Sequence, residues 1–211
     1  DSSIKKSYLG FVKEKEMNKK YITKHFDEVK KAWEEKNPRT VSIIKMDVSD
    51  ADNLTETEAK KKSNIDKALE KESFADVAKA FSEDSNTANK NGFAGYVDSN
   101  STSSDSSSTS TVPADVVTAA IGLKKGETSD WITVTSSSGT SLYKVYVKET
   151  NSKKIFNAKS DTVSNQALYA ILNSDSSLSY KILDSHAKKL DIKFNDKDTK
   201  KKFDSYVKTT Y

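Results

Sequence analysis

The sequence has no cysteine, and this absence excludes disulfide bonds, thiolate metal ligands and cysteine nucleophiles. It does not decide the compartment, because cytosolic and exported proteins both often lack cysteine. No apolar run approaches the ~20 residues needed to cross a bilayer. The sequence also lacks a signal peptide and begins with Asp1 rather than Met, so we expect a processed or trimmed chain without its targeting segment.

Charge is what the chain has in abundance. Charged residues make up 31% of the sequence and hydrophobic residues only 34%, which is typical of a soluble protein with a modest core. Lysines alternate with acidic residues along the whole chain. This pattern favours solvated helix faces over a nucleic-acid-binding stripe, and no nucleic-acid partner is predicted. The net charge of +4 would still attract polyanions such as cell-wall polymers or acidic lipid headgroups.

Helical patterns occupy both ends of the chain. Within residues 1–38, Phe26, Val29 and Trp33 fall on one apolar helix face. Asn37-Pro38 predicts the end of that helix, because a residue before proline avoids the α region. Residues 151–211 are again helical in pattern. We predict that the two ends form one discontinuous helical lobe whose apolar stripe is either buried or partly offered to other polypeptides.

The middle of the chain, residues 39–150, predicts a compact α+β module inserted into that lobe. Arg39 to Val48 is rich in β-branched residues and predicts a strand whose side chains alternate between two faces. Ser73 predicts the cap of a helix that starts at Phe74, and residues 131–150 predict a β-hairpin. Residues 99–111 are almost all Ser or Thr and predict a flexible surface loop.

Four blocks of this middle segment resemble the parvulin (PpiC-type) peptidyl-prolyl isomerases. In family order they are SFADVAKAFSEDS, NGFAGYV, VVTAAIGLKKGETSDWITV and SSGTSLYKV. The resemblance implies an α+β fold, with a small antiparallel sheet and surrounding helices over residues 39–150. It also implies catalysis of rotation about the peptide bond before proline.

The flanking helices and the ending DIKFNDKD resemble the PrsA-type extracytoplasmic foldases. That resemblance implies unfolded or nascent exported polypeptides as partners. It implies a location on the outer face of the cell membrane of a Gram-positive bacterium, through a lipid anchor that is not in this chain. A second copy of this chain, in a homodimer, is a further hypothesis for its partner.

The resemblance also implies which residues stand at the catalytic positions. The family network has two histidines, an Asp or Cys, and a hydroxyl. Matched by motif, Ser42 and Ser141 stand at the two histidine positions, Asp84 at the Asp or Cys position, and Ser138 at the hydroxyl. Serine lacks the reach and the tunable protonation of imidazole, so weak or no isomerase activity is predicted. The substrate-binding candidates are Ala94, Val112, Val116, Ile121 and Phe93.

The two histidines of the chain, His25 and His186, lie outside the middle module. No Ser-His-Asp arrangement is therefore predicted in the module. Neither histidine has carboxylates at a metal-ligand spacing, so we predict neither a metal site nor a cofactor.

Three hypotheses follow for the function. The first is an extracytoplasmic foldase that acts as a chaperone and whose parvulin-like module has a degenerate active site. The second is an active peptidyl-prolyl isomerase with a diverged site, in which hydroxyl groups replace the imidazoles. The third is a non-enzymatic cell-surface protein whose Ser/Thr loop and basic face contact cell-wall polymers or host partners.

Overall fold

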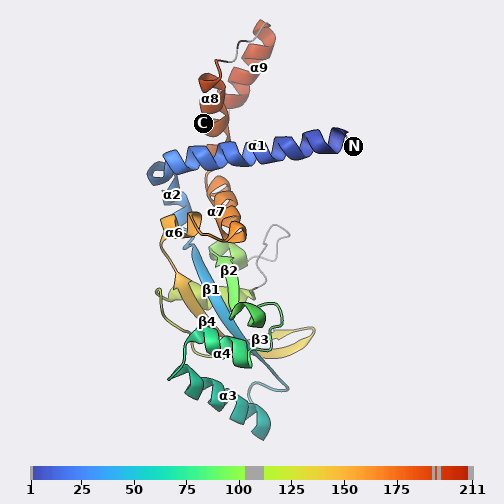
Figure 1. Cartoon of the computed structure of the whole chain (residues 1–211), viewed down its shortest axis with the longest axis vertical. Coiled ribbons are helices and arrows are strands. Elements are labelled where there is room, and N and C mark those ends of the chain that lie inside the picture. The colour runs from blue at the N-terminus through green and yellow to red at the C-terminus, as the bar shows by residue number, and fades with distance from the viewer. Residues whose placement is uncertain (1, 103–111, 192, 194–195, 209–211) are drawn as a thin grey trace. The chain divides into compact units, whose positions relative to one another are not determined.

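The computed structural model describes residues 2–102, 112–191, 193 and 196–208 (Figure 1). The chain forms two compact units. The sheet unit is Lys36–Ser164, and the helical unit joins Asp1–Glu35 to Asn165–Tyr211. The predicted α+β fold, with a sheet-containing module inserted into a discontinuous helical part, is therefore confirmed. Among the described residues, none of the helices is both long enough and apolar enough to traverse a bilayer.

Within its described residues, the sheet unit contains four strands with helices between them. Its strands are β1 (Arg39–Val48), β2 (Phe93–Val97), β3 (Ile132–Ser136) and β4 (Gly139–Glu149). Its helices are α3 (Glu56–Leu69), α4 (Phe74–Phe81), η1 (Ala88–Lys90), η2 (Ser99–Thr102), α5 (Ala114–Gly122) and α6 (Ser152–Phe156). The remaining helices are α1 (Ser2–Lys24), α2 (Phe26–Glu34), α7 (Asp161–Ser174), α8 (Leu178–Lys189) and α9 (Lys197–Lys208), and the division between the two units falls inside α7.

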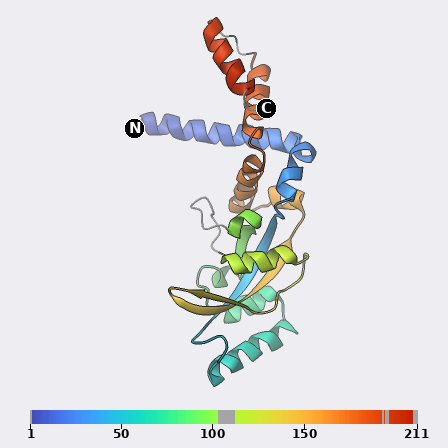
Figure 2. The same ribbon diagram turned by 180° about the vertical axis from the view of Figure 1, so that it is seen from behind.

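The four strands form one antiparallel sheet in the order β2-β1-β4-β3. Alternate residues of β1 enter two different hydrophobic clusters, as its strand pattern predicts. Val41 and Ile43 pack with α5, whereas Ile44 and Met46 pack with α3 and α4. Figure 1 shows α4 in front of the sheet, and Figure 2 shows the yellow-green α5 across the opposite face. The sheet is therefore covered on both faces.

The local signals in the sheet unit are also confirmed. The hydroxyl of Ser73 accepts a hydrogen bond from the Asp76 N–H at 3.2 Å and caps α4. The expected hairpin is β3 and β4, joined at Ser137 and Ser138. The loop predicted at residues 99–111 begins instead with a short helix, because residues 99–102 form η2, and residues 103–111 lie outside the described residues.

In the helical unit the predicted apolar stripe is mostly buried. Phe26 is 6% exposed and Trp33 is 0% exposed, and their rings meet edge to face at 6.5 Å. These two side chains are therefore not offered to other polypeptides. In the described part of the chain, the exposed large apolar side chains lie elsewhere: Ile4, Tyr8, Leu9 and Phe11 on the N-terminal half of α1, Tyr169 in α7 and Leu190 after α8.

A buried arginine connects the start of β1 to the end of α5. Arg39, the only arginine of the chain, is 7% exposed. Its Nη1 donates to the carbonyl oxygens of Ala120 and Leu123, and its Nε donates to the Asn37 carbonyl at 3.1 Å. The last carbonyls of a helix have no partner within the helix. Arg39 supplies that partner inside the sheet unit and holds α5 against the sheet.

Replacing this arginine with methionine, Arg39→Met, is expected to lower the free energy of unfolding by about 2 to 4 kcal/mol. Methionine keeps much of the apolar volume but leaves buried carbonyl oxygens without a charged donor. Urea unfolding followed by fluorescence would measure the loss. The matched control is Lys125→Met, which removes a partly exposed ion pair to Glu149 at 2.8 Å and should cost under about 1 kcal/mol. Equal losses in the two variants would contradict an anchoring role for Arg39.

Candidate functional site

The site predicted from the motifs lies where β1 runs beyond its pairing with β2. That pairing ends at Ser42, and the segment after α4 then takes the place of a neighbouring strand. The N–H of Glu83 donates to the Lys45 carbonyl at 2.9 Å, and the Lys45 N–H donates to Ser82 Oγ at 3.1 Å. The Asp47 N–H donates to a Glu83 carboxylate oxygen at 2.6 Å. The residues Ser82 and Glu83 of the FSED motif thus satisfy backbone groups that an open strand edge would leave unpaired.

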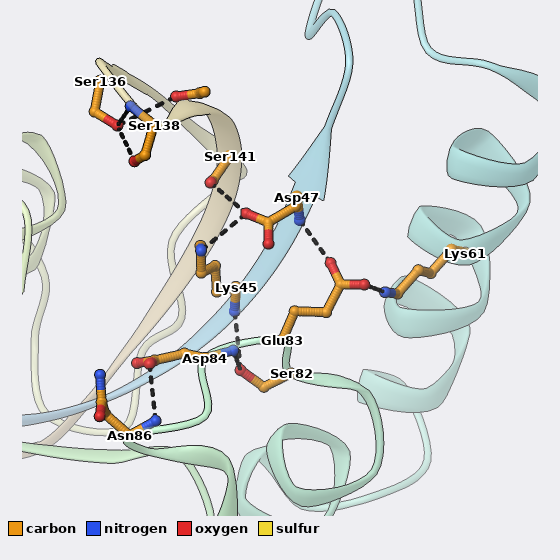
Figure 3. Close-up of polar contacts among 11 residues, drawn as sticks. Lys45, Asp47, Lys61, Ser82, Glu83, Asp84, Asn86, Ser136, Ser138 and Ser141 are labelled. Atoms are coloured by element: carbon orange, nitrogen blue, oxygen red, sulfur yellow. Dashed lines mark hydrogen bonds and ion pairs between the residues drawn. The ribbon is translucent and has the colours of Figure 1, made fainter.

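On the other side of β1, the strand register places Asp47 opposite Ser141 of β4. Ser141 Oγ donates to Asp47 Oδ1 at 2.6 Å, and Lys45 Nζ lies 2.9 Å from the same oxygen (Figure 3). Lys61 of α3 pairs with Glu83, whose carboxylate also accepts from the Asp47 N–H. The three side chains of Lys45, Asp47 and Ser141 form one polar network, which we call the Asp47 network.

The charges of the Asp47 network reinforce one another. The hydrogen bond between the Lys45 and Asp47 side chains is the main reason that the pKa of Lys45 is raised. Partial burial alone would raise the pKa of Asp47, but the hydrogen bonds from Ser141 and Lys45 outweigh burial and lower it. Burial raises the pKa of the neighbouring Tyr143 hydroxyl, with a smaller opposing effect from Lys45. Lysine is therefore positive and aspartate negative throughout the neutral range, and neither exchanges a proton there.

Asp84 lies close to this network, but its hydrogen bonds are with residues that follow it in the same turn. Its carboxylate accepts from the Asn86 N–H at 3.1 Å and from Thr87 Oγ1 at 2.8 Å, which stabilises the turn before η1. Its negative charge contributes to the raised pKa values of Lys45 and Tyr143. Figure 3 shows Asp84 near Lys45, on the opposite side from Ser141. Asp84 thus acts on the network through its charge.

The other two predicted catalytic positions are placed apart from the network. Ser42 is 6% exposed and lies between Val41 and Ile43, which both pack toward α5. Strand alternation therefore directs the Ser42 side chain to the opposite face from Ser141. Ser138 lies in the exposed hairpin turn, where its hydroxyl lies 2.8 Å from the Ser136 hydroxyl (Figure 3). The structure brings together Ser141 and the region of Asp84, and separates both from Ser42.

The predicted pocket walls are mostly part of the hydrophobic core. Val112 is 5% exposed and Val116 is 0% exposed, so neither presents much surface to a ligand. Ala94 and Ile121 are half-buried at the edge of the same cluster. Phe93 is also half-buried, and the Lys148 ammonium lies 5.1 Å from its ring centroid. Half-buried Val134 and Tyr143 continue this apolar edge beside the Asp47 network.

Lys45, Asp47 and Tyr143 were not among the predicted site residues. The alternation of β1 already placed Lys45 and Asp47 on one face, but only the register of β4 puts Ser141 next to them. Among the described residues, no three His, Asp or Glu side chains gather closely enough to hold a metal ion. With no group that titrates near neutral pH, the arrangement offers fixed charges and hydrogen bonds beside an apolar edge.

This sheet unit matches a known family over most of its length. Residues 43–149, half of the chain, match the family model described as "Rotamase: PPIC-type PPIASE domain". The chain belongs to this family of PpiC-type peptidyl-prolyl isomerases, the parvulins. Four antiparallel strands with helices on both faces are therefore the parvulin sheet unit. No curated protein matches the chain.

Solved structures of PrsA proteins are similar to this parvulin chain over most of its length. The foldase protein PrsA from Streptococcus pneumoniae str. Canada MDR_19A is 25% identical, with a TM-score of 0.41, over 92% of this chain and 65% of that one. The peptidylprolyl isomerase PrsA from Bacillus cereus is 20% identical, with a TM-score of 0.39, over 92% and 64%. PrsA from Bacillus anthracis is 26% identical, with a TM-score of 0.36, over 93% and 78%. Because this chain spans less than two thirds of the first two proteins, the activity and partners of a whole foldase are proposals for it.

Proposed function

We propose that the chain is an extracytoplasmic foldase that holds exported polypeptides while they fold, and that its parvulin sheet unit has a degenerate catalytic site. The Asp47 network is the observation that carries this proposal. Where the family has imidazoles, this chain has the hydroxyl of Ser141 donating 2.6 Å to Asp47, whose carboxylate is also paired with Lys45. Such a network can hold a peptide carbonyl or N–H, but it cannot exchange protons near neutral pH as a histidine does.

The exposed apolar side chains of α1 support the holding function. Ile4, Tyr8 and Phe11 are 71%, 66% and 55% exposed and follow the i, i+4, i+7 spacing of one helix face. An exposed row of large apolar side chains of this kind is typical of a surface that contacts other polypeptides. We call these three residues the α1 apolar row.

A second candidate function is favoured by one feature of the same site. The Asp47 network lies beside the half-buried apolar side chains of Val134 and Tyr143. An apolar surface that excludes water, next to oriented polar groups, is the environment that stabilises a twisted prolyl peptide bond, which has lost its amide resonance. Slow prolyl isomerisation by a diverged site is therefore the alternative, and the isomerase measurement in the Discussion separates the two functions.

The holding function predicts that the chain suppresses aggregation. At equimolar concentration, the full chain should at least halve the light scattering of a chemically unfolded test protein that is diluted into buffer. The variant Ile4→Ser/Tyr8→Ser/Phe11→Ser should lose most of this suppression, because it removes the apolar contact area. The matched control is Lys60→Ser/Asn64→Ser/Lys67→Ser, with the same spacing on an exposed face of α3.

Two outcomes would contradict the holding function. If the full chain leaves the scattering unchanged, a non-enzymatic surface protein is the better account of the chain. If the α1 and α3 variants lose suppression equally, the α1 apolar row is not the contact surface.

A further inference from the structure

The helical unit contains a cleft lined by lysines that form no ion pair with any other described residue. A cavity of about 610 Å³ lies between α1 and α8, within the size range of ligand sites. Lys13, Lys20 and Lys24 line it from α1, and Lys189 lines it from α8. We call this cavity the lysine cleft.

The three α1 lysines share one helix face. Positions 13, 20 and 24 differ by seven and four residues, which corresponds to about two turns and one turn of a helix. All four lysines of the cleft are exposed. In the described part of the chain, no acidic side chain lies within 4.0 Å of any of their ammonium groups, although many other lysines are paired. These charges are therefore available to a ligand.

The acidic groups at the cleft do not cancel this charge. Glu14 and Glu16 also line it, which leaves four lysines against two glutamates. Both histidines of the chain, His25 and His186, line the cleft as well. His25 is held in place by Glu28, 3.0 Å from its Nδ1, and by stacking on Tyr21 at 4.5 Å. The cleft as a whole is cationic, so it complements an anion.

The cleft also has an apolar part. Half-buried Met17 and Tyr21 line it from α1, and buried Ile182 lines it from α8. A polyphosphate would meet only the lysines and would leave this apolar surface unused. A polypeptide segment with carboxylates beside apolar side chains would use both.

We propose that the lysine cleft binds acidic polypeptide segments in which carboxylates alternate with apolar side chains. This inference rests on the proposed holding function and names a class of polypeptide for it. The α1 apolar row would then contact apolar stretches, while the lysine cleft selects acidic ones.

Binding of a defined peptide to the full chain tests the proposal. The probe is a fluorescein-labelled octapeptide with three glutamates spaced by leucine, serine and phenylalanine, and its anisotropy reports the Kd at about 0.15 M salt, where charges on opposite faces of a helix are largely screened from each other. The variant Lys20→Glu/Lys24→Glu should raise the Kd at least about tenfold, because two attractive charges become repulsive. The matched control Lys15→Glu/Lys19→Glu makes the same charge change on the opposite face of α1 and should change the Kd less than about twofold.

The same assay contains the outcomes that overturn the proposal. If a peptide with lysines in place of the three glutamates binds as tightly, the negative charge of the peptide does not contribute to binding. Equal weakening by both double variants would indicate general surface charge rather than the cleft. Tighter binding of inorganic polyphosphate than of the peptide, lost in Lys20→Glu/Lys24→Glu, would assign the cleft to polyphosphates instead. Because no folding assay is involved, a failure here leaves the holding function untouched.

Discussion

Replacing Gly92 with alanine is expected to destabilise the sheet unit by about 3 to 4 kcal/mol. Gly92 has a φ of +76°, which side chains other than glycine rarely adopt. A Cβ there would lie 2.6 Å from the Ala78 Cβ and 2.8 Å from the Ile43 carbonyl oxygen. Relief of that overlap must move α4 or β1, and it would disturb the 2.8 Å hydrogen bond from the Ile43 N–H to the Gly92 carbonyl.

Gly122→Ala is the matched control for this effect. Nothing lies within 4 Å of a Cβ at Gly122, which ends α5 without a positive φ, so the variant should be neutral or slightly stabilising. Urea unfolding of both variants, followed by the fluorescence to which Trp131 contributes from the sheet unit, measures the difference. A Gly92→Ala loss no larger than about 1 kcal/mol would mean that β1 and α4 are less tightly packed around this turn than the structure indicates.

The elements that carry strong local signals could be predicted from the sequence. Ser73 caps its helix as expected, because an N-cap hydroxyl accepts a hydrogen bond from a backbone N–H only three residues further along the chain. The hairpin at residues 131–150 formed because two β-rich runs flank a short turn. The two-faced pattern of β1 was also correct, since one face packs on α5 and the other on α3 and α4.

The geometry of the site could not be predicted in the same way. Motif matching predicted that Ser42 and Ser141 belong to one catalytic network, whereas the strand register places Asp47, and not Ser42, opposite Ser141. In the register of β1 with β4, Ser42 lies opposite Tyr146, and no local pattern in either strand reports which residues pair across it. The anchoring by Arg39 links positions that are 81 and 84 residues apart, and so it too depends on tertiary packing.

The second large effect is expected in prolyl isomerisation. Positioned acid–base groups contribute about 10²- to 10⁴-fold to a reaction, and the Asp47 network has none that titrates near neutral pH. We therefore expect the full chain to isomerise prolyl peptides at, or only slightly above, the uncatalysed rate. Asp47 has a lowered pKa and Lys45 a raised one, so both stay charged and any residual rate should be flat from about pH 5 to pH 9.

Ser141→His is a control for this interpretation. It places an imidazole beside the Asp47 carboxylate, which favours the charged form of histidine and raises its pKa above the usual value of about 6.5. Any activity of this variant should then depend on pH near neutrality, unlike that of the unaltered chain. A pH profile identical to that of the unaltered chain would argue against a catalytic location for Ser141.

The most direct test of a degenerate parvulin site is the isomerisation rate of a series of Ala-Xaa-Pro-Phe tetrapeptides with the full chain at micromolar concentration. The degenerate-site account predicts a rate indistinguishable from background, or a small pH-independent excess, for every residue at Xaa. Acceleration of about 10²-fold or more that disappears in Asp84→Ala or Ser141→Ala would contradict the account and identify the chain as an active isomerase.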